Sequence, residues 1–219
     1  MRKVIGVAIV VALLAVGTAQ AQGAPASGIS LGARVGYGIP IGDADGGDAL
    51  TPPAAMSDLV SGQLPLQLDI TYRFNPNWQL GLYFQYGIAF ASNTFCPSGV
   101  SCSGSDIRLG GEVMYTFASP GFSPWIGLGL GYEWLNLSAE AGGVSADFQV
   151  SGFEFLNLQV GGDWRLSPNF KMGPFVAFSI ASYDSISVTV PGAGTVSGDI
   201  ANTTTHEWLQ FGLKGTFDL

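Results

Sequence analysis

The stretch that decides the fold runs from residue 78 to residue 90 and reads Trp78-Gln79-Leu80-Gly81-Leu82-Tyr83-Phe84-Gln85-Tyr86-Gly87-Ile88-Ala89-Phe90. Every second residue from Trp78 onward is large and apolar or aromatic, whereas the residues between them are glutamine, glycine, tyrosine or alanine. Such alternation predicts a β-strand with one apolar face and one polar or small face. The run is also long enough to cross a bilayer, which takes a tilted strand of ~9–11 residues.

The same alternation recurs along the chain and predicts eight strands. They lie near residues 29–40, 63–74, 78–90, 105–117, 124–137, 152–166, 170–183 and 206–219. Short connections at 75–77, 118–123 and 167–169 alternate with long ones at 41–62, 91–104, 138–151 and 184–205. This layout is typical of bacterial outer-membrane barrels, with short periplasmic turns and long outer loops. We therefore predict an all-β, eight-stranded antiparallel up-and-down transmembrane β-barrel with both termini in the periplasm.

The composition excludes several other classes of protein. Only 11% of the 219 residues are charged, well below the ~25% of an ordinary soluble domain. A hydrophobic content of 47% is too high for a disordered chain. The net charge of −8 argues against a nucleic-acid partner, which requires a basic surface.

The first residues have the layout of a secretory signal peptide. Met1-Arg2-Lys3 is positively charged, residues 4–16 are apolar and uncharged, and Ala19-Gln20-Ala21 offers a cleavage site. An apolar run of this length is too short for a membrane-spanning helix, which needs ~20 residues. We expect a cleaved signal peptide at residues 1–21 and an outer-membrane β-barrel domain at residues 22–219.

The charged residues of the strands share the polar face in the alternation. All six basic residues after the signal peptide fall on it, as expected if a basic side chain facing mid-bilayer lipid costs ~2–4 kcal/mol. Eight strands leave a lumen just wide enough for side chains to fill. We therefore predict a plugged barrel rather than an open pore. The predicted lumen charge network consists of Arg34, Asp69, Arg73, Arg108, Glu112, Glu133, Asp163, Arg165, Lys171, Lys214 and Asp218.

The sixth segment departs from the pattern. Phe153 and Phe155 fall on the inner parity and Glu154 on the outer parity. Either this strand begins later, near Leu156, or a β-bulge shifts its phase.

The long connections carry the remaining acidic residues and no lysine or arginine, so we expect an acidic outer surface. The acidic loop Asp43, Asp45 and Asp48 resembles a calcium loop only loosely, because the spacing and the distal glutamate of an EF-hand are missing. We expect solvation there rather than a metal site. Cys96 and Cys102 are close in sequence and predict a loop-closing disulfide in an oxidising compartment.

Two sequence motifs resemble the outer-membrane β-barrel domain family, to which the transmembrane domain of outer membrane protein A belongs. They are Pro124-Trp125-Ile126-Gly127-Leu128-Gly129-Leu130-Gly131-Tyr132 and Gly32-Ala33-Arg34-Val35-Gly36-Tyr37. The chain ends with Phe217 and Leu219, similar to the terminal signal that the barrel-assembly machinery reads, although the final residue is leucine rather than an aromatic. The resemblance implies a barrel in the outer membrane and no particular activity.

Three functions are compatible with such a barrel. The first is a non-enzymatic, monomeric barrel without cofactors, surrounded by outer-membrane lipid, with a structural or surface-interaction role through its loops. The second is a narrow channel for small or hydrophobic solutes, resembling the outer membrane protein W family, with an outer pocket near Leu135, Phe153 and Phe155. The third is a lipid A-modifying barrel enzyme built on His206, beside Thr203, Thr205 and Glu207. We favour the first, because His206 shares the lumen parity of Trp208 and its hydroxyl neighbours are threonines.

Overall fold

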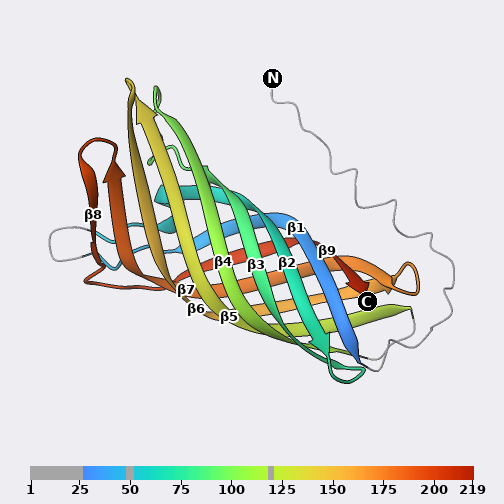
Figure 1. Ribbon diagram of the computed structural model, residues 1–219. Coiled ribbons are helices and arrows are strands. Elements are labelled where there is room, and N and C mark those ends of the chain that lie inside the picture. The colour runs from blue at the N-terminus through green and yellow to red at the C-terminus, as the bar shows by residue number, and fades with distance from the viewer. Residues whose placement is uncertain (1–26, 48–51, 118–120) are drawn as a thin grey trace.

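The computed structural model describes residues 27–47, 52–117 and 121–219 (Figure 1). The predicted signal peptide and Asp48 lie outside these residues. One short helix is present, α1 (Met56–Leu59), and within the described ranges no helix is long and apolar enough to span a membrane. The strands are β1 (Gly28–Gly42), β2 (Val60–Arg73), β3 (Trp78–Ala91), β4 (Ser101–Thr116), β5 (Phe122–Ala141), β6 (Val144–Arg165), β7 (Phe170–Val190), β8 (Gly194–Asp199) and β9 (His206–Asp218).

Eight of these strands form a closed antiparallel ring. Each of β1 to β7 pairs with the next strand in sequence, and β9 closes the ring by pairing with both β7 and β1. The remaining strand, β8, pairs only with β7 and lies outside the ring. The predicted eight-stranded up-and-down barrel is therefore confirmed, and all eight predicted segments overlap the strands of the ring.

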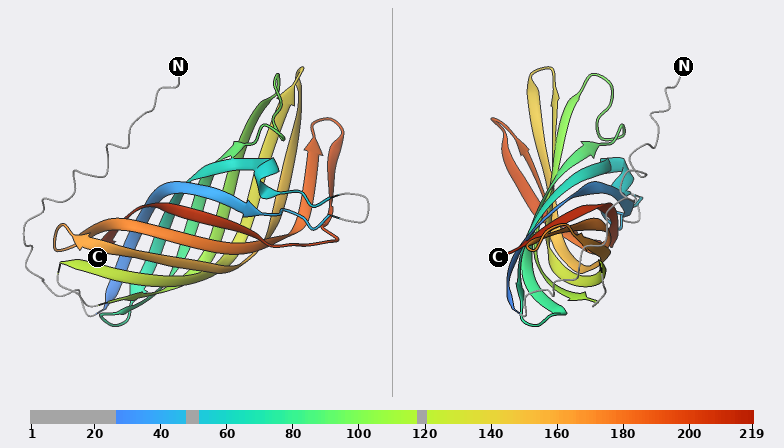
Figure 2. Two further views of the ribbon diagram at one scale, coloured as in Figure 1. Left: turned by 180° about the vertical axis from the view of Figure 1, so that it is seen from behind. Right: turned by 90° about the vertical axis from the view of Figure 1, so that its right-hand side faces the viewer.

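The two ends of the barrel differ. The start of β1, the end of β9 and the short β2–β3, β4–β5 and β6–β7 connections share one end, called here the turn end. The other end, called the mouth end, carries helix α1, the β3–β4 loop and the outer parts of β5 to β8 (Figure 2). The hairpins at the mouth end rise well beyond the ring, so the molecule is asymmetric along its axis.

Two connections that we predicted to be long loops are instead β-hairpins. β5 and β6 continue outward as paired strands, and only Gly142 and Gly143 separate them. Their φ angles of 58° and 79° are the left-handed pair that a tight two-residue hairpin turn requires. β7 likewise continues to residue 190 and returns as β8, so the predicted loop at 184–205 contains a second hairpin.

The outer face of the ring is a band of exposed apolar side chains. Leu82 is 66% exposed and Leu68 is 61% exposed. Exposing so many neighbouring apolar side chains is unfavourable in water and favourable in lipid. Some of the exposed aromatic side chains lie near the turn end, as in the aromatic girdles of outer-membrane barrels. They include Tyr72, Phe74, Trp78, Phe117, Trp164 and Phe217.

A β-bulge in β6 resolves the departure of the sixth segment. Gly129 pairs with Asn157 and Gly131 with Glu154, so β6 holds one residue more than β5 across this step. The extra residue reverses the phase of the strand. Glu154 is therefore fully buried in the lumen, whereas Phe153 and Phe155 are exposed on the outside. The bulge alternative is confirmed, and the placement of both phenylalanines in an outer pocket is wrong.

Candidate functional site

The lumen of the barrel contains two layers of buried charged side chains, and Arg34 on β1 organises the one nearer the turn end. Its Nε donates to Asp69 of β2 at 2.8 Å, and its Nη2 lies 3.0 Å from Glu112 of β4. Gln159 of β6 bridges the group by accepting from Arg34 at 2.5 Å and donating to Glu112 at 3.0 Å. Lys214 of β9 lies 4.4 Å from the Trp125 ring centre. Two cations thus face two carboxylates in this layer, called here the Arg34 cluster.

The turn end carries a smaller set of pairs. Asp218 accepts hydrogen bonds from Ser30 at 2.7 Å and from Arg73 at 3.3 Å, and the Lys171 ammonium lies 3.6 Å away. Asp163 accepts from the Trp125 indole at 3.2 Å. Arg165 instead donates to the main-chain carbonyl of Pro168, at the exposed turn.

The layer nearer the mouth end, called here the Arg108 cluster, is richer in carboxylates. Arg108 is 1% exposed and lies within 3.0 Å of Asp106, 3.2 Å of Glu154 and 3.4 Å of Glu133. It also donates to Ser179 at 2.9 Å. One guanidinium therefore faces three buried carboxylates that come from three different strands.

Neutral donors satisfy the remaining carboxylate oxygens of the Arg108 cluster. Glu133 accepts from the Tyr183 hydroxyl at 2.7 Å and from the Trp208 indole at 3.1 Å. Glu154 accepts from the Tyr83 hydroxyl and, at 3.1 Å, from Asn157. These bonds are charge-assisted and hold the layer in one arrangement.

His206 belongs to the same cluster. Its ring is fully buried, its Nε2 lies 3.3 Å from Glu133, and it stacks on Tyr183 with 4.0 Å between ring centres. The predicted lumen parity of His206 is confirmed, since its side chain is buried inside the barrel. Thr203 and Thr205 are exposed, so the structure places neither hydroxyl beside this imidazole in the buried layer.

Glycines make room for the Tyr83 side chain in this layer. Tyr83 lies across β4 and β5 directly over Gly110 and Gly131, and a Cβ atom at either position would collide with its ring or hydroxyl. Gly111, the next residue along β4, faces the other way, and its nearest neighbour would be a carbonyl oxygen at 3.7 Å. The glycine-rich inner surface therefore lets Tyr83 reach Glu154 on the far side of the lumen.

An apolar cluster closes the lumen above the Arg108 cluster. Met56 of α1, Val60, Leu135 and Leu137 are each fully buried there. Tyr183 and Trp208 belong to both layers, so the apolar cluster rests directly on the charged one. In the described part of the chain, buried charged and apolar side chains fill the lumen, as the prediction of a plugged barrel requires.

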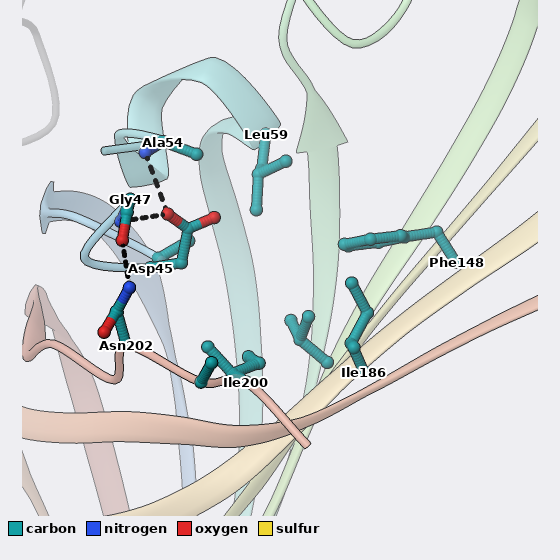
Figure 3. A pocket seen from close by; sticks show the side chains of 11 residues that line it. Asp45, Gly47, Ala54, Leu59, Phe148, Ile186, Ile200 and Asn202 are labelled. Atoms are coloured by element: carbon teal, nitrogen blue, oxygen red, sulfur yellow. Dashed lines mark hydrogen bonds between the residues drawn. The ribbon is translucent and has the colours of Figure 1, made fainter. Parts of the chain in front are cut away.

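A cavity of about 480 Å³ lies above this apolar cluster, between the β1–β2 connection, α1, and the outer parts of β6 and β7 (Figure 3). We call it the mouth pocket. Its walls are mainly apolar, and Asp45 is the charged residue among the described lining residues. The full lining consists of Ala44, Asp45, Gly47, Ala54, Leu59, Phe148, Val150, Ile186, Ile200, Ala201 and Asn202.

Main-chain hydrogen bonds fix the polar side of the mouth pocket. Asp45 accepts from the amides of Gly47 at 2.8 Å and Ala54 at 3.4 Å. The Asn202 side chain donates to the Gly47 carbonyl at 2.5 Å, and its own main-chain carbonyl accepts from the Gly46 amide at 2.7 Å. The segment after β8 is thereby tied to the β1–β2 connection, which closes one side of the pocket.

Solved structures with the same architecture are known, whereas no protein-family model and no curated protein matches the sequence. A major outer membrane protein from Thermus thermophilus has a TM-score of 0.62 at 13% identity, over 89% of this chain and 100% of that one. Neisserial surface protein A has a TM-score of 0.54 at 12% identity, over 88% of this chain and 99% of that one. The fold is that of an outer-membrane β-barrel. Outer membrane protein AlkL has the same fold, with a TM-score of 0.50 at 19% identity, over 94% of this chain and 97% of that one.

The barrel brings every predicted network residue to the inner face or its turn-end rim. The sequence interpretation missed two of the carboxylates, Asp106 and Glu154. Asp106 shares the parity of Arg108 and could have been found by the same count, whereas Glu154 required the bulge. The buried tyrosines that bind these carboxylates carry no charge and were not singled out.

The acidic loop is only partly described. Asp43 forms a β-bridge with Ala55, Asp45 lines the mouth pocket, and Asp48 lies outside the described residues. Across the described part of the chain, no three His, Cys, Asp or Glu side chains are grouped to hold a metal ion. Cys96 and Cys102 form the predicted disulfide, which braces the β3–β4 loop.

Proposed function

We propose that this chain is a non-enzymatic, monomeric integral protein of the bacterial outer membrane, with a closed lumen and a surface-interaction role at its mouth end. The observation that carries the proposal is the filled interior. Arg108, Glu133 and Glu154 are almost completely buried, and the apolar cluster seals the lumen above them. A channel would require this ion-paired layer to come apart, and separating a buried pair is costly.

The unequal strand lengths support the second half of the proposal. β5, β6 and β7 have 20 to 22 residues, whereas the ~9–11 residues of a tilted strand suffice to cross the bilayer. Their outer parts carry polar side chains on the surface, including the pair of Ser138 with Asp147 and that of Asn136 with Gln149. β8 adds an exposed edge strand, a form of structure that pairs readily with another chain.

Orientation follows from the same asymmetry. We place the turn end in the periplasm and the hairpins outside the cell, because outer-membrane barrels carry their longer connections outside. Among the described residues, the exposed acidic side chains lie at the mouth end, which gives the outer surface its negative charge in this proposal. They are Asp58, Glu140, Asp147, Asp184 and Asp199.

Two measurements test the proposal. Protein refolded in detergent is expected to migrate differently before and after boiling, and then to stay silent in planar bilayers. Discrete single-channel conductance from the folded species would overturn the closed lumen.

Orientation is tested with a protease site inserted either between Gly142 and Gly143 or after Asn75. Intact cells are expected to be cleaved at the first site and protected at the second. Cleavage at the second site alone would reverse the orientation.

A further inference from the structure

We propose that the mouth pocket binds a small apolar molecule that carries a positively charged amine, with the apolar body among the aliphatic side chains and the ammonium at Asp45. The proposal concerns a dead-end binding site rather than a passage through the barrel. It is independent of the surface-interaction role of the hairpins.

The shape and lining of the pocket favour an apolar body. Leu59, Phe148, Ile186 and Ile200 come from separate parts of the chain and face a common space of about 480 Å³ (Figure 3). A cavity of this size and lining is in the range of small-molecule sites, in which apolar walls bury most of the ligand. Ala44 and Val150 line the pocket and belong to the buried apolar cluster that also contains Leu135 and Leu137, so packed apolar side chains adjoin the pocket.

The charge of the ligand follows from the residues around the pocket. Asp45 contributes the charged side chain of the described lining, and its carboxylate is held in place by the amides of Gly47 and Ala54. No lysine or arginine occurs in the sequence between residues 35 and 72 or between residues 172 and 213. These two stretches supply most of the pocket, and the rest of its lining, Phe148 and Val150, is uncharged. An anionic ligand therefore meets no counter-charge, whereas an ammonium meets one.

The walls are also held firmly enough to form a site. The hydrogen bonds between Asn202 and the β1–β2 connection, at 2.5 and 2.7 Å, fix two walls against each other. Ile200 is anchored through its amide, which donates to the Asp184 carbonyl at 2.9 Å. Preorganised walls reduce the conformational entropy lost on binding.

The test uses three probes with one naphthalene body: 1-naphthylmethylamine, 1-naphthylmethanol and 1-naphthylacetate. The full barrel is refolded into lipid nanodiscs with isoleucine methyl groups labelled for NMR. The methyl signals of Ile186 and Ile200 are expected to shift and saturate, while that of Ile126, on the lipid-facing surface, stays unchanged. Equal shifts at Ile126 would mean partition into the bilayer and would overturn the proposal, as would no shift at Ile186 and Ile200.

The amine is expected to bind about five- to tenfold more tightly than the alcohol, and the acetate most weakly, as suits a partly exposed ion pair. Asp45→Asn retains the hydrogen-bond acceptor and is expected to erase the difference between amine and alcohol while leaving alcohol binding unchanged. Asp147→Asn is the matched control, an exposed acid at the same end. An equal loss in both variants would assign the selectivity to the general field and overturn the role of Asp45.

A second variant tests whether the probes occupy the cavity itself, independently of the charge at Asp45. Ile186→Trp places a larger side chain in the cavity and is expected to abolish binding of all three probes, with heat modifiability retained as evidence of folding. Undiminished binding of the amine to this folded variant would place the site elsewhere and overturn the proposal.

Discussion

Replacing Arg108 with methionine tests whether the buried charge layer stabilises the barrel. The substitution keeps an unbranched side chain, shorter than that of arginine, and removes the guanidinium. It leaves Asp106, Glu133 and Glu154 in the lumen without the cation that all three contact at 3.0 to 3.4 Å. Removing one partner of a buried ion pair costs ~3–5 kcal/mol, because the remaining charge stays buried. We expect a loss at the upper end of this range, since three carboxylates are affected.

The assay is urea unfolding of the barrel refolded into lipid vesicles, followed by tryptophan fluorescence. With a slope of ~2 kcal/mol per molar urea, a loss of ~4 kcal/mol lowers the midpoint by ~2 M. Arg165→Met is the matched control, because Arg165 makes only an exposed hydrogen bond to the Pro168 carbonyl, whose loss costs little stability. Its free energy of unfolding is expected to change by less than ~0.5 kcal/mol.

A compensating change sharpens the test. Glu154→Gln in the Arg108→Met background removes one uncompensated carboxylate and keeps an acceptor for the Tyr83 hydroxyl. Residues in one network commonly couple by ~0.5–3 kcal/mol, so the double variant is expected to be more stable than Arg108→Met alone. Equal midpoints for Arg108→Met and Arg165→Met would refute the reasoning and assign the stability of the barrel to the strand ladder and lipid contacts.

Three further outcomes follow from the structure. Gly110→Ala is expected to destabilise the barrel by ~1–3 kcal/mol in the same unfolding assay, because the new methyl group meets the buried tyrosine ring; Gly111→Ala, facing outward, is the control and should be nearly neutral. Reduction by an added thiol reductant is expected to add the mass of two hydrogen atoms at Cys96 and Cys102 and to raise hydrogen exchange only in the β3–β4 loop; faster exchange throughout the barrel would contradict a local brace. His206→Ala is expected to lower the unfolding midpoint, since it removes a fully buried ring, and to leave lipid A unmodified in mass spectra as in wild type.

The ring was predictable from the sequence because lipid imposes a strict rule on it. Residues that face hydrocarbon must be apolar, so the strands from Leu64 and from Trp78 show their two faces directly in the alternation. The same rule placed all six basic side chains inward or at the rim. It needed no knowledge of which strands pair, because inward and outward are set by residue parity alone.

Beyond the bilayer that rule no longer applies, and there the sequence interpretation failed. In the outer parts of β5 and β6 the polar residues Asn136, Ser138 and Gln149 lie on the outward face. The inward face there is apolar and buried, as at Leu135 and Leu137, so the alternation runs in the opposite sense to that of the lipid-facing band. The mouth pocket was not predicted for a related reason. Its walls come from connections that are distant in sequence, and their apposition depends on main-chain hydrogen bonds such as that between Gly46 and Asn202.

The distribution of charge along the axis links the lumen to the mouth pocket. Near the turn end, Arg73, Arg165 and Lys171 outnumber Asp163 and Asp218. The Arg34 cluster is balanced, whereas the Arg108 cluster has three carboxylates for one guanidinium.

The ratio of carboxylates to basic side chains thus increases toward the mouth end, where Asp45 and the exposed acidic residues of the described chain continue the trend. Asp45 is partly buried in the wall of the pocket, so salt screens its attraction for an ammonium only in part, and selectivity for a cation is expected to persist in part when the salt concentration is raised.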